Sequence, residues 1–166
     1  MDFPITFWIM VVFLSIGFIC NVVSFAAPFW NKVDSFHWGL WQMCSETNGC
    51  EAVSTEILTD VMLVGRVLIS IGFVLHIILI LLLVLYKFWR DSIHLLTAAC
   101  IVAFISLSTL FIGAVLWMSS SNTTFTWCYY LCYASAFVLS SSCGTILYIR
   151  RYKRFKDSNL DVTGEN

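Results

Sequence analysis

Four long runs of apolar residues, separated by shorter polar segments, dominate the pattern of this chain. The runs cover residues 5–27, 67–86, 95–117 and 127–149, and none of them contains Asp, Glu, Lys or Arg. Each run has about the 20 residues that an α-helix needs to cross the hydrocarbon core of a bilayer. The pattern therefore predicts an all-α membrane protein, a four-helix transmembrane bundle.

The composition agrees with this interpretation. The chain is 60% hydrophobic and 11% charged, with a mean hydropathy of +0.87, which is more apolar than ordinary soluble domains. The polar segments are too short to bury a core of their own, so we expect residues 1–149 to form one domain. A cleaved signal peptide is an alternative for the first run. It has no basic residues before it and exceeds the roughly 7–15 apolar residues of a signal peptide, which favours a retained span.

The basic residues indicate how the chain is oriented. Most of the 9 Lys and Arg residues lie in the connector after the second run or in the tail, namely Lys87, Arg90, Arg150, Arg151, Lys153, Arg154 and Lys156. The positive-inside rule then places both termini and the tail 150–166 in the cytoplasm, and loops 28–66 and 118–126 outside. Tryptophans near the predicted span ends are typical of membrane–water interfaces: Trp8, Trp30, Trp89, Trp117 and Trp127.

Polar groups inside the spans are few. We interpret Asn21 and His76 as hydrogen-bond partners between helices, because neither has a second candidate ligand at helical spacing. The spans contain no acidic residues, which argues against an ion-coupled transporter. The sequence shows no nucleophile elbow, phosphate loop or zinc spacing, so we expect no enzymatic activity, no cofactor and no metal site. The net charge of -1 gives no indication of nucleic-acid binding.

Two smaller motifs lie at the fourth span. Ala136, Ser140 and Gly144 form a stripe of small residues at a spacing of four, which we expect to face a neighbouring span, with another protomer as the alternative. Asn122 begins the sequence "NTT", an N-glycosylation sequon close to the bilayer, so Asn122 is a candidate acceptor.

A polar stretch in the first outer loop, "HWGLWQMCSETNGCE" (37–51), has the features of a disulfide-linked β-hairpin. Cys44 and Cys50 flank an Asn-Gly pair, a strong hairpin turn signal, on the oxidising side of the membrane. We predict a small extracellular β-hairpin or sheet with strands 36–44 and 50–55, stapled by a Cys44–Cys50 disulfide that contributes roughly 2 kcal/mol. The remaining cysteines are interpreted as small apolar packing residues: Cys20, Cys100, Cys128, Cys132 and Cys143.

The residues around this stretch resemble a known family signature. "PFW" followed by "GLWQMC" and a second cysteine is similar to the W-x-GLW-x-C-x-C motif of the claudin superfamily, which includes claudins, peripheral myelin protein, epithelial membrane proteins and the lens fibre intrinsic protein. An arginine also falls where claudins have one at the start of their second span. The residues that carry the resemblance are Trp30, Gly39, Leu40, Trp41, Cys44, Cys50 and Arg66.

Two departures place the chain nearer the short myelin, epithelial and lens type than the tight-junction claudins. Only eight residues, 31–38, separate Trp30 from Gly39, fewer than in claudins, which implies that part of the claudin extracellular sheet is missing. The tail ends in "VTGEN" and lacks the hydrophobic carboxyl terminus through which most claudins bind PDZ domains.

The resemblance implies a non-enzymatic plasma-membrane protein at cell contacts or junctions. It would associate in the bilayer with copies of itself or with related four-span proteins, and its stapled outer loop would serve cell–cell contact or membrane organisation. One alternative is a paracellular barrier or cation-selective pore, whose acidic residues would be Asp34, Glu46, Glu51 and Glu56. Another is an accessory subunit that modulates the trafficking of a channel or receptor.

Overall fold

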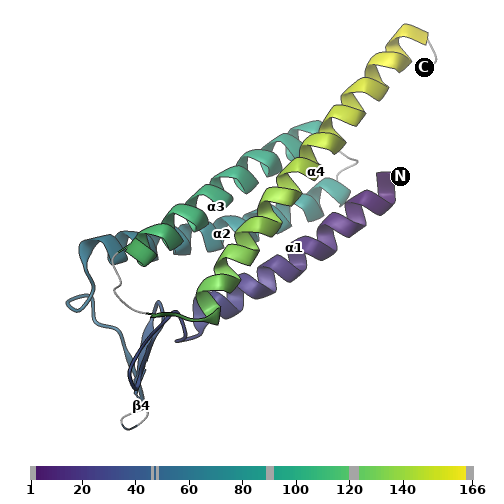
Figure 1. Ribbon diagram of the computed structural model, residues 1–166. Helices are drawn as coiled ribbons and strands as arrows, with labels where there is room; N and C mark the ends of the chain where they lie inside the picture. Colours follow the sequence, from purple (N-terminus) through teal and green to yellow (C-terminus); the bar gives the residue numbers. More distant parts are fainter. Residues whose placement is uncertain (1–2, 46, 48, 89–91, 120–123, 164–166) are drawn as a thin grey trace.

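The computed structural model describes residues 3–45, 47, 49–88, 92–119 and 124–163. Four long helices run through it: α1 (Phe3–Ala26), α2 (Asp60–Phe88), α3 (Ile93–Ser119) and α4 (Trp127–Thr163). Each contains a segment long and apolar enough to cross a membrane. The protein is therefore a four-helix transmembrane bundle, as predicted, and a small sheet covers one end of it (Figure 1). We call this the sheet end.

Two helices extend beyond the apolar runs that predicted them. The predicted outer loop reached residue 66, but α2 already begins at Asp60, where Met62 N donates to Thr59 Oγ1 at 3.3 Å. Thr59 thus satisfies one of the amide groups that a helix start leaves without a partner. Helix α4 continues through the predicted tail to Thr163. Hydropathy detects only the part of a helix that lies in hydrocarbon, so it misses such extensions.

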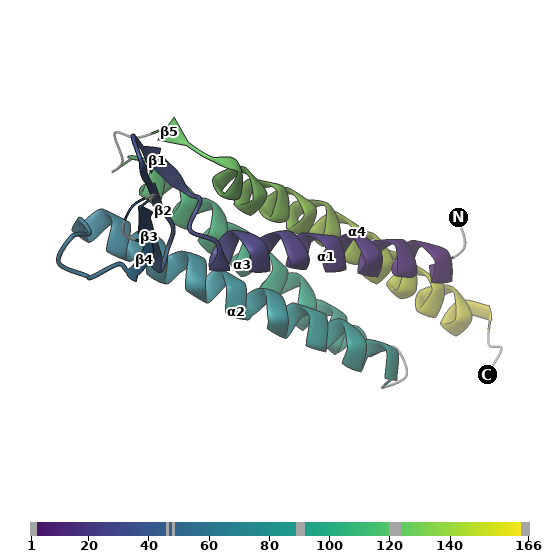
Figure 2. The ribbon, with the colours of Figure 1, turned by 90° about the horizontal axis from the view of Figure 1, so that it is seen from below.

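The helices do not pack equally against one another. Contact is most extensive between α2 and α3, followed by the α1–α4 and α3–α4 pairs, and it is sparse between α1 and α2 (Figures 1 and 2). Gly65 and Gly113 allow the backbones of α2 and α3 to approach closely, and Ser106 Oγ donates to Gly72 O at 2.9 Å. Small residues at a close crossing are typical of membrane helices.

Aromatic rings and one polar pair fill the interface of α1 and α2. Phe73 of α2 stacks on Phe25 and Phe18 of α1, with ring centroids 4.7 and 5.9 Å away. Asn21 Nδ2 lies 3.4 Å from His76 Nδ1, and both residues are buried. The predicted hydrogen bonding of these two residues between helices is thereby confirmed.

The small-residue stripe of α4 needs a correction. Ala136 is buried, but Ser140 and Gly144 are exposed, and a Cβ added to Gly144 would meet no other atom within 4 Å. Gly144 therefore does not face a neighbouring span of the same chain, whereas Ser140 borders a groove that also includes Leu107 and Phe111 of α3. A spacing of four residues drifts by about 40° per step around a helix of 3.6 residues per turn, so Gly144 lies about 80° away from Ala136.

The sheet extends beyond the two strands that the sequence predicted. Its five antiparallel strands, in the order β4-β3-β2-β1-β5, are β1 (Asn31–Val33), β2 (Phe36–Trp38), β3 (Gln42–Ser45), β4 (Gly49–Ala52) and β5 (Thr124–Phe125). The predicted strand 36–44 is interrupted at 39–41, and its two halves pair with each other, Trp38 opposite Met43. The short stretch 31–38 is itself a hairpin, which turns at Asp34 with a φ of 48°.

The close approach of α2 and α3 leads to a test by Gly113→Ala. The added Cβ would lie 2.8 Å from Ile69 Cγ1 and 3.0 Å from Gly65 O, so the helices must separate. Overpacking of this kind costs about 1–3 kcal/mol, and we expect a lower thermal midpoint of the purified protein in detergent. Gly144→Ala is the matched control and should leave the midpoint unchanged or slightly higher. Equal midpoints for the two variants would contradict this packing.

Candidate functional site

The sheet is attached to the bundle through Trp30. This side chain is fully buried, its Nε1 donates to Ser24 O at 2.6 Å, and its ring centroid lies 5.9 Å from that of Trp117. Trp117 is also fully buried. Both tryptophans lie near the ends of spans, as predicted, but their rings are covered by protein. They form the core between the sheet and the helices.

The Gly-Leu-Trp triplet crosses the end of α1 between β2 and β3. A Cβ on Gly39 would lie 2.6 Å from both Ala27 O and Pro28 Cα, so only glycine fits this crossing. The next residue, Leu40, is fully buried. Glycine therefore permits the close approach of the two backbones, and the Leu40 side chain is buried beside it.

Trp41 and Arg66 complete the attachment on the side of α2. The Arg66 guanidinium lies 5.1 Å from the centroid of the Trp41 ring, and Trp41 in turn packs edge-on against Phe25 at 5.2 Å. Arg66 is only 7% exposed, and its Nε and Nη2 have no hydrogen-bond partner among the described residues. Its cation–π contact, worth up to about 2 kcal/mol in a desolvated place, therefore offsets part of the cost of burying the charge.

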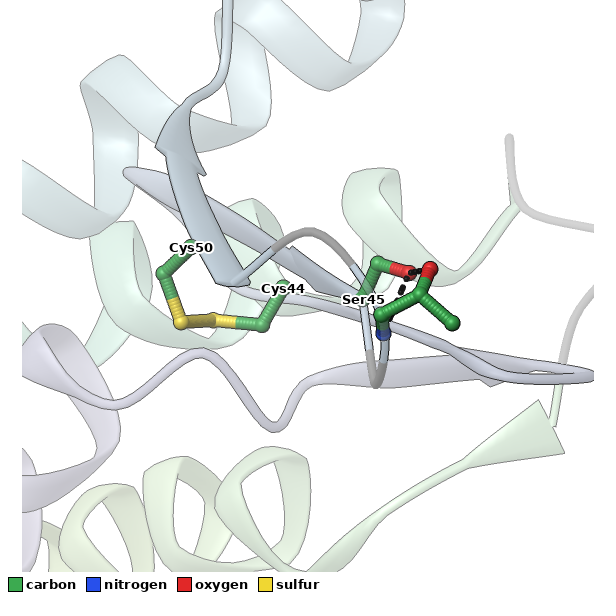
Figure 3. Close-up of a disulfide and its surroundings, with 4 residues drawn as sticks. Cys44, Ser45 and Cys50 are labelled. Atoms are coloured by element: carbon green, nitrogen blue, oxygen red, sulfur yellow. Dashed lines mark hydrogen bonds between the residues drawn. A yellow bond between two sulfur atoms is a disulfide. The ribbon is translucent and has the colours of Figure 1, made fainter.

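The predicted disulfide is present. Cys44 and Cys50 lie opposite each other in the β3–β4 pair and are joined by a bond between their sulfur atoms (Figure 3). Gly49 takes a φ of 77° at the turn, and Thr47 N donates to Ser45 Oγ at 3.3 Å. The five other cysteines are free, and Cys128 and Cys132 are buried, as expected for packing residues.

The loop between α3 and α4 also takes part, which the sequence did not indicate. Thr124 Oγ1 donates to Lys32 O at 2.9 Å, and Thr126 N donates to Trp30 O at 3.0 Å. Thr126 Oγ1 also donates to Phe29 O. Strand β5 has only two residues, too few for the alternation that identifies a strand in sequence. It joins the first loop to the start of α4.

One face of the sheet carries apolar side chains that are partly exposed. Phe36 lies opposite Ser45, and Trp38 lies opposite Met43, so these four residues share a face with Gly49 and Glu51. Phe36 is 40% exposed and borders a shallow depression of about 60 Å³ together with Met43 and Glu51. We call Phe36, Trp38 and Met43 the apolar sheet face. The sequence analysis counted Phe36 and Trp38 only as aromatic content of the loop.

Two of the acidic residues considered for an ion path, Asp34 and Glu51, lie apart in the sheet. Asp34, Glu51 and Glu56 are all exposed. Asp34 follows β1 and Glu51 lies in β4, and two strands separate them in the sheet, a distance of about 14 Å at the usual strand spacing. Glu46 and Asn122 lie outside the described residues.

Comparison with known proteins adds no information on this site. No family model and no curated protein matches the chain. Within the described ranges, no three or more His, Cys, Asp or Glu side chains are grouped so that they could hold a metal ion. The site is therefore interpreted from its own geometry, as a stapled sheet held on a membrane bundle.

The disulfide predicts equal effects for its two cysteines. Cys44→Ser and Cys50→Ser should each reduce the amount of protein at the cell surface, because the loop loses roughly 2 kcal/mol and unfolded protein is retained. The double variant should cost little more, since either single change already removes the whole bond. Surface biotinylation measures this, with Cys143→Ser, a free cysteine, as the control. Normal surface levels of both single variants would refute a stabilising role of the bond.

The two tryptophans of the attachment should differ in their effects. Trp30→Ala removes a fully buried ring and leaves Ser24 O without its donor, so we expect a loss of about 3–5 kcal/mol. Trp41 is 39% exposed, and Trp41→Ala should therefore cost less. Thermal unfolding of the purified variants in detergent gives the order. A lower midpoint for Trp41→Ala than for Trp30→Ala would contradict Trp30 as the main attachment.

Proposed function

We propose that this protein is a non-enzymatic, claudin-like membrane protein that makes contacts between cells through its sheet. The observation that carries the proposal is the apolar sheet face. Phe36 remains 40% exposed although the sheet is fixed to the bundle by Trp30 and stapled by a disulfide. A rigid, partly apolar surface in water is typical of a protein interaction site.

The edge of the sheet supports the same proposal. All four residues of β4 are exposed, and β4 is the last strand on its side of the sheet. An edge strand presents unpaired amide and carbonyl groups to any partner strand. Another copy of this sheet, or a different outer domain, would find both hydrogen-bonding groups and apolar side chains there.

Orientation is part of the proposal. Most of the basic residues lie in the connector between α2 and α3 or in the second half of α4, away from the sheet end. By the positive-inside rule, the sheet then faces the outside of the plasma membrane and both termini face the cytoplasm. Cell junctions are the place where such a surface meets another cell.

Lateral association in the membrane would support these contacts. Gly144 is exposed and has open space beside it, so a helix of another protomer or of a related four-span protein can approach there. Phe137, on the same helix, is 76% exposed beside a groove shared with α3. Arrays of copies would multiply weak contacts between cells.

The geometry favours contact over an ion path in a single chain. Asp34 and Glu51 are separated by two strands of the sheet, so these two residues do not act together on one ion. Contact through the apolar sheet face needs one copy from each membrane. No specific feature favours an accessory role for a channel or receptor.

The apolar sheet face can be tested with Phe36→Ser. We expect cells that express this variant to aggregate several-fold less than cells with the natural protein, because the contact loses apolar area. Ile57→Ser is the matched control, since Ile57 is 52% exposed in the same loop but lies outside the strands. Surface biotinylation must first show equal amounts of both variants.

Unchanged aggregation by Phe36→Ser at normal surface levels would contradict the proposal. Glu51→Gln tests the alternative of a cation-selective pore. If Glu51 lines such a pore, removal of its charge should lower the preference for cations across a cell sheet. A loss of selectivity in Glu51→Gln without any loss of aggregation in Phe36→Ser would favour the pore.

A further inference from the structure

A groove lies between α1 and α2, towards the end of the bundle opposite the sheet. It has a volume of about 170 Å³ and runs between Trp8, Val11 and Leu14 of α1 and Ile80, Val84 and Lys87 of α2. This is where the two helices, which contact each other sparsely along their length, leave space between them. The groove is distinct from the sheet and takes no part in the proposed cell contact.

The floor of the groove is protein core and its rim faces the bilayer. Leu14 and Leu83 are only 2% and 3% exposed, whereas Trp8 is 55% and Phe88 is 80% exposed. In a membrane, the space between these rims opens directly to lipid. Whatever fills it must therefore come from the bilayer.

Water is a poor occupant of this groove. Its lining is apolar except for Ser15 and Lys87, and Ser15 Oγ already donates to Val11 O of its own helix at 2.9 Å. A buried water needs two to four polar partners, and the walls do not offer them. An acyl chain needs none.

Lys87 gives the groove a charged end. It is the basic residue in the last turn of α2, and its Nζ lies 6.0 Å from the ring centroid of Phe7 in the groove floor. Among the residues that the structure describes, no acidic side chain lines the groove. Lys87 thus places an ammonium group at the membrane boundary, at one end of the apolar groove.

The distance from the Lys87 charge to the far end of the groove, at Ile80, suits a lipid. Lys87 and Ile80 are separated by two turns of α2, which is roughly 10 Å at 1.5 Å per residue. This matches the first half of a fatty acyl chain that descends from a head group at the boundary. A second copy of the protein would instead have to cover the Lys87 ammonium group with apolar surface, which is unfavourable.

We propose that the groove binds one acyl chain of a glycerophospholipid whose head group carries net negative charge, with that head group held by Lys87. The site depends on charge complementarity at one end and on apolar fit along the rest. It holds whichever side of the membrane this end of the bundle faces. It is also independent of the function proposed for the sheet.

The test uses the purified full-length protein in phosphatidylcholine vesicles. A trace of phosphatidylserine with a photoreactive acyl chain is added, or the same probe on phosphatidylcholine, and labelled peptides are identified by mass spectrometry. We expect label on the groove residues of α1 and α2, with about a fivefold preference for phosphatidylserine, the size expected for one basic residue near a membrane surface.

Lys87→Gln should bring the preference close to one. Arg151→Gln is the matched control, because Arg151 is an exposed basic residue of α4 outside the groove, and it should keep the preference. Val84→Trp fills the groove and should reduce labelling by both probes, while a thermal midpoint close to that of the natural protein in detergent shows that the variant is folded.

Several results would overturn the proposal. They are equal labelling by the two probes in the natural protein, an undiminished preference in Lys87→Gln, loss of label on addition of a sterol, and crosslinks between two protein copies at the groove. Failure of the Phe36→Ser aggregation test would leave this lipid site untouched, so the two proposals are judged separately.

Discussion

The burial of Trp30 is the interaction on which the rest of this structure depends. Its indole donates to Ser24 O at the end of α1, its backbone N donates to Trp38 O in β2, and its backbone O accepts from Thr126 N before α4. One residue thereby ties the first helix, the sheet and the last helix together. Without it, the sheet would be a short set of strands on a flexible connector, and isolated strands of this size are marginal in water.

The attachment solves a problem particular to membrane proteins. Near the bilayer, backbone groups that find no water must be paired within the protein. The segment between α1 and β1 is irregular, and the threonine side chain and amide of residue 126 supply partners for its carbonyl groups. A buried charge has a partner at the start of α2. The Arg66 guanidinium lies over the face of the Trp41 ring, and this contact offsets part of the cost of burying the charge.

The two ends of the molecule therefore serve different surroundings. At the sheet end, a disulfide and the Trp30 attachment hold apolar side chains in water, which supports our proposal of contact with another membrane. Towards the opposite end, loose contact between α1 and α2 leaves an apolar groove with Lys87 beside it, which supports our proposal of a lipid site. The bundle between them is closed by the small residues of α2 and α3, so it offers a rigid support for both.

Local signals in the sequence were sufficient for the parts of the fold that depend on a single segment. Each span follows from its own run of apolar residues, and the Cys44–Cys50 pair follows from two cysteines around an Asn-Gly turn, because the bilayer and the turn act on neighbouring residues. The hydrogen bonding of Asn21 and His76 was also accessible, since polar groups in hydrocarbon need partners.

Only the tertiary structure decided which surfaces meet. Trp30 and Trp41 are both tryptophans of the same polar segment, yet the first is fully buried and the second is partly exposed. The positions of α4 and of the sheet determine what covers each ring. Strand β5 forms because a pairing partner 92 residues away in the chain holds Thr124. Gly144 turns away from the neighbouring spans because the drift of a four-residue spacing and the packing of Ala136 together set the rotation of α4. Such outcomes depend on distant residues, and no local pattern in a single sequence encodes them.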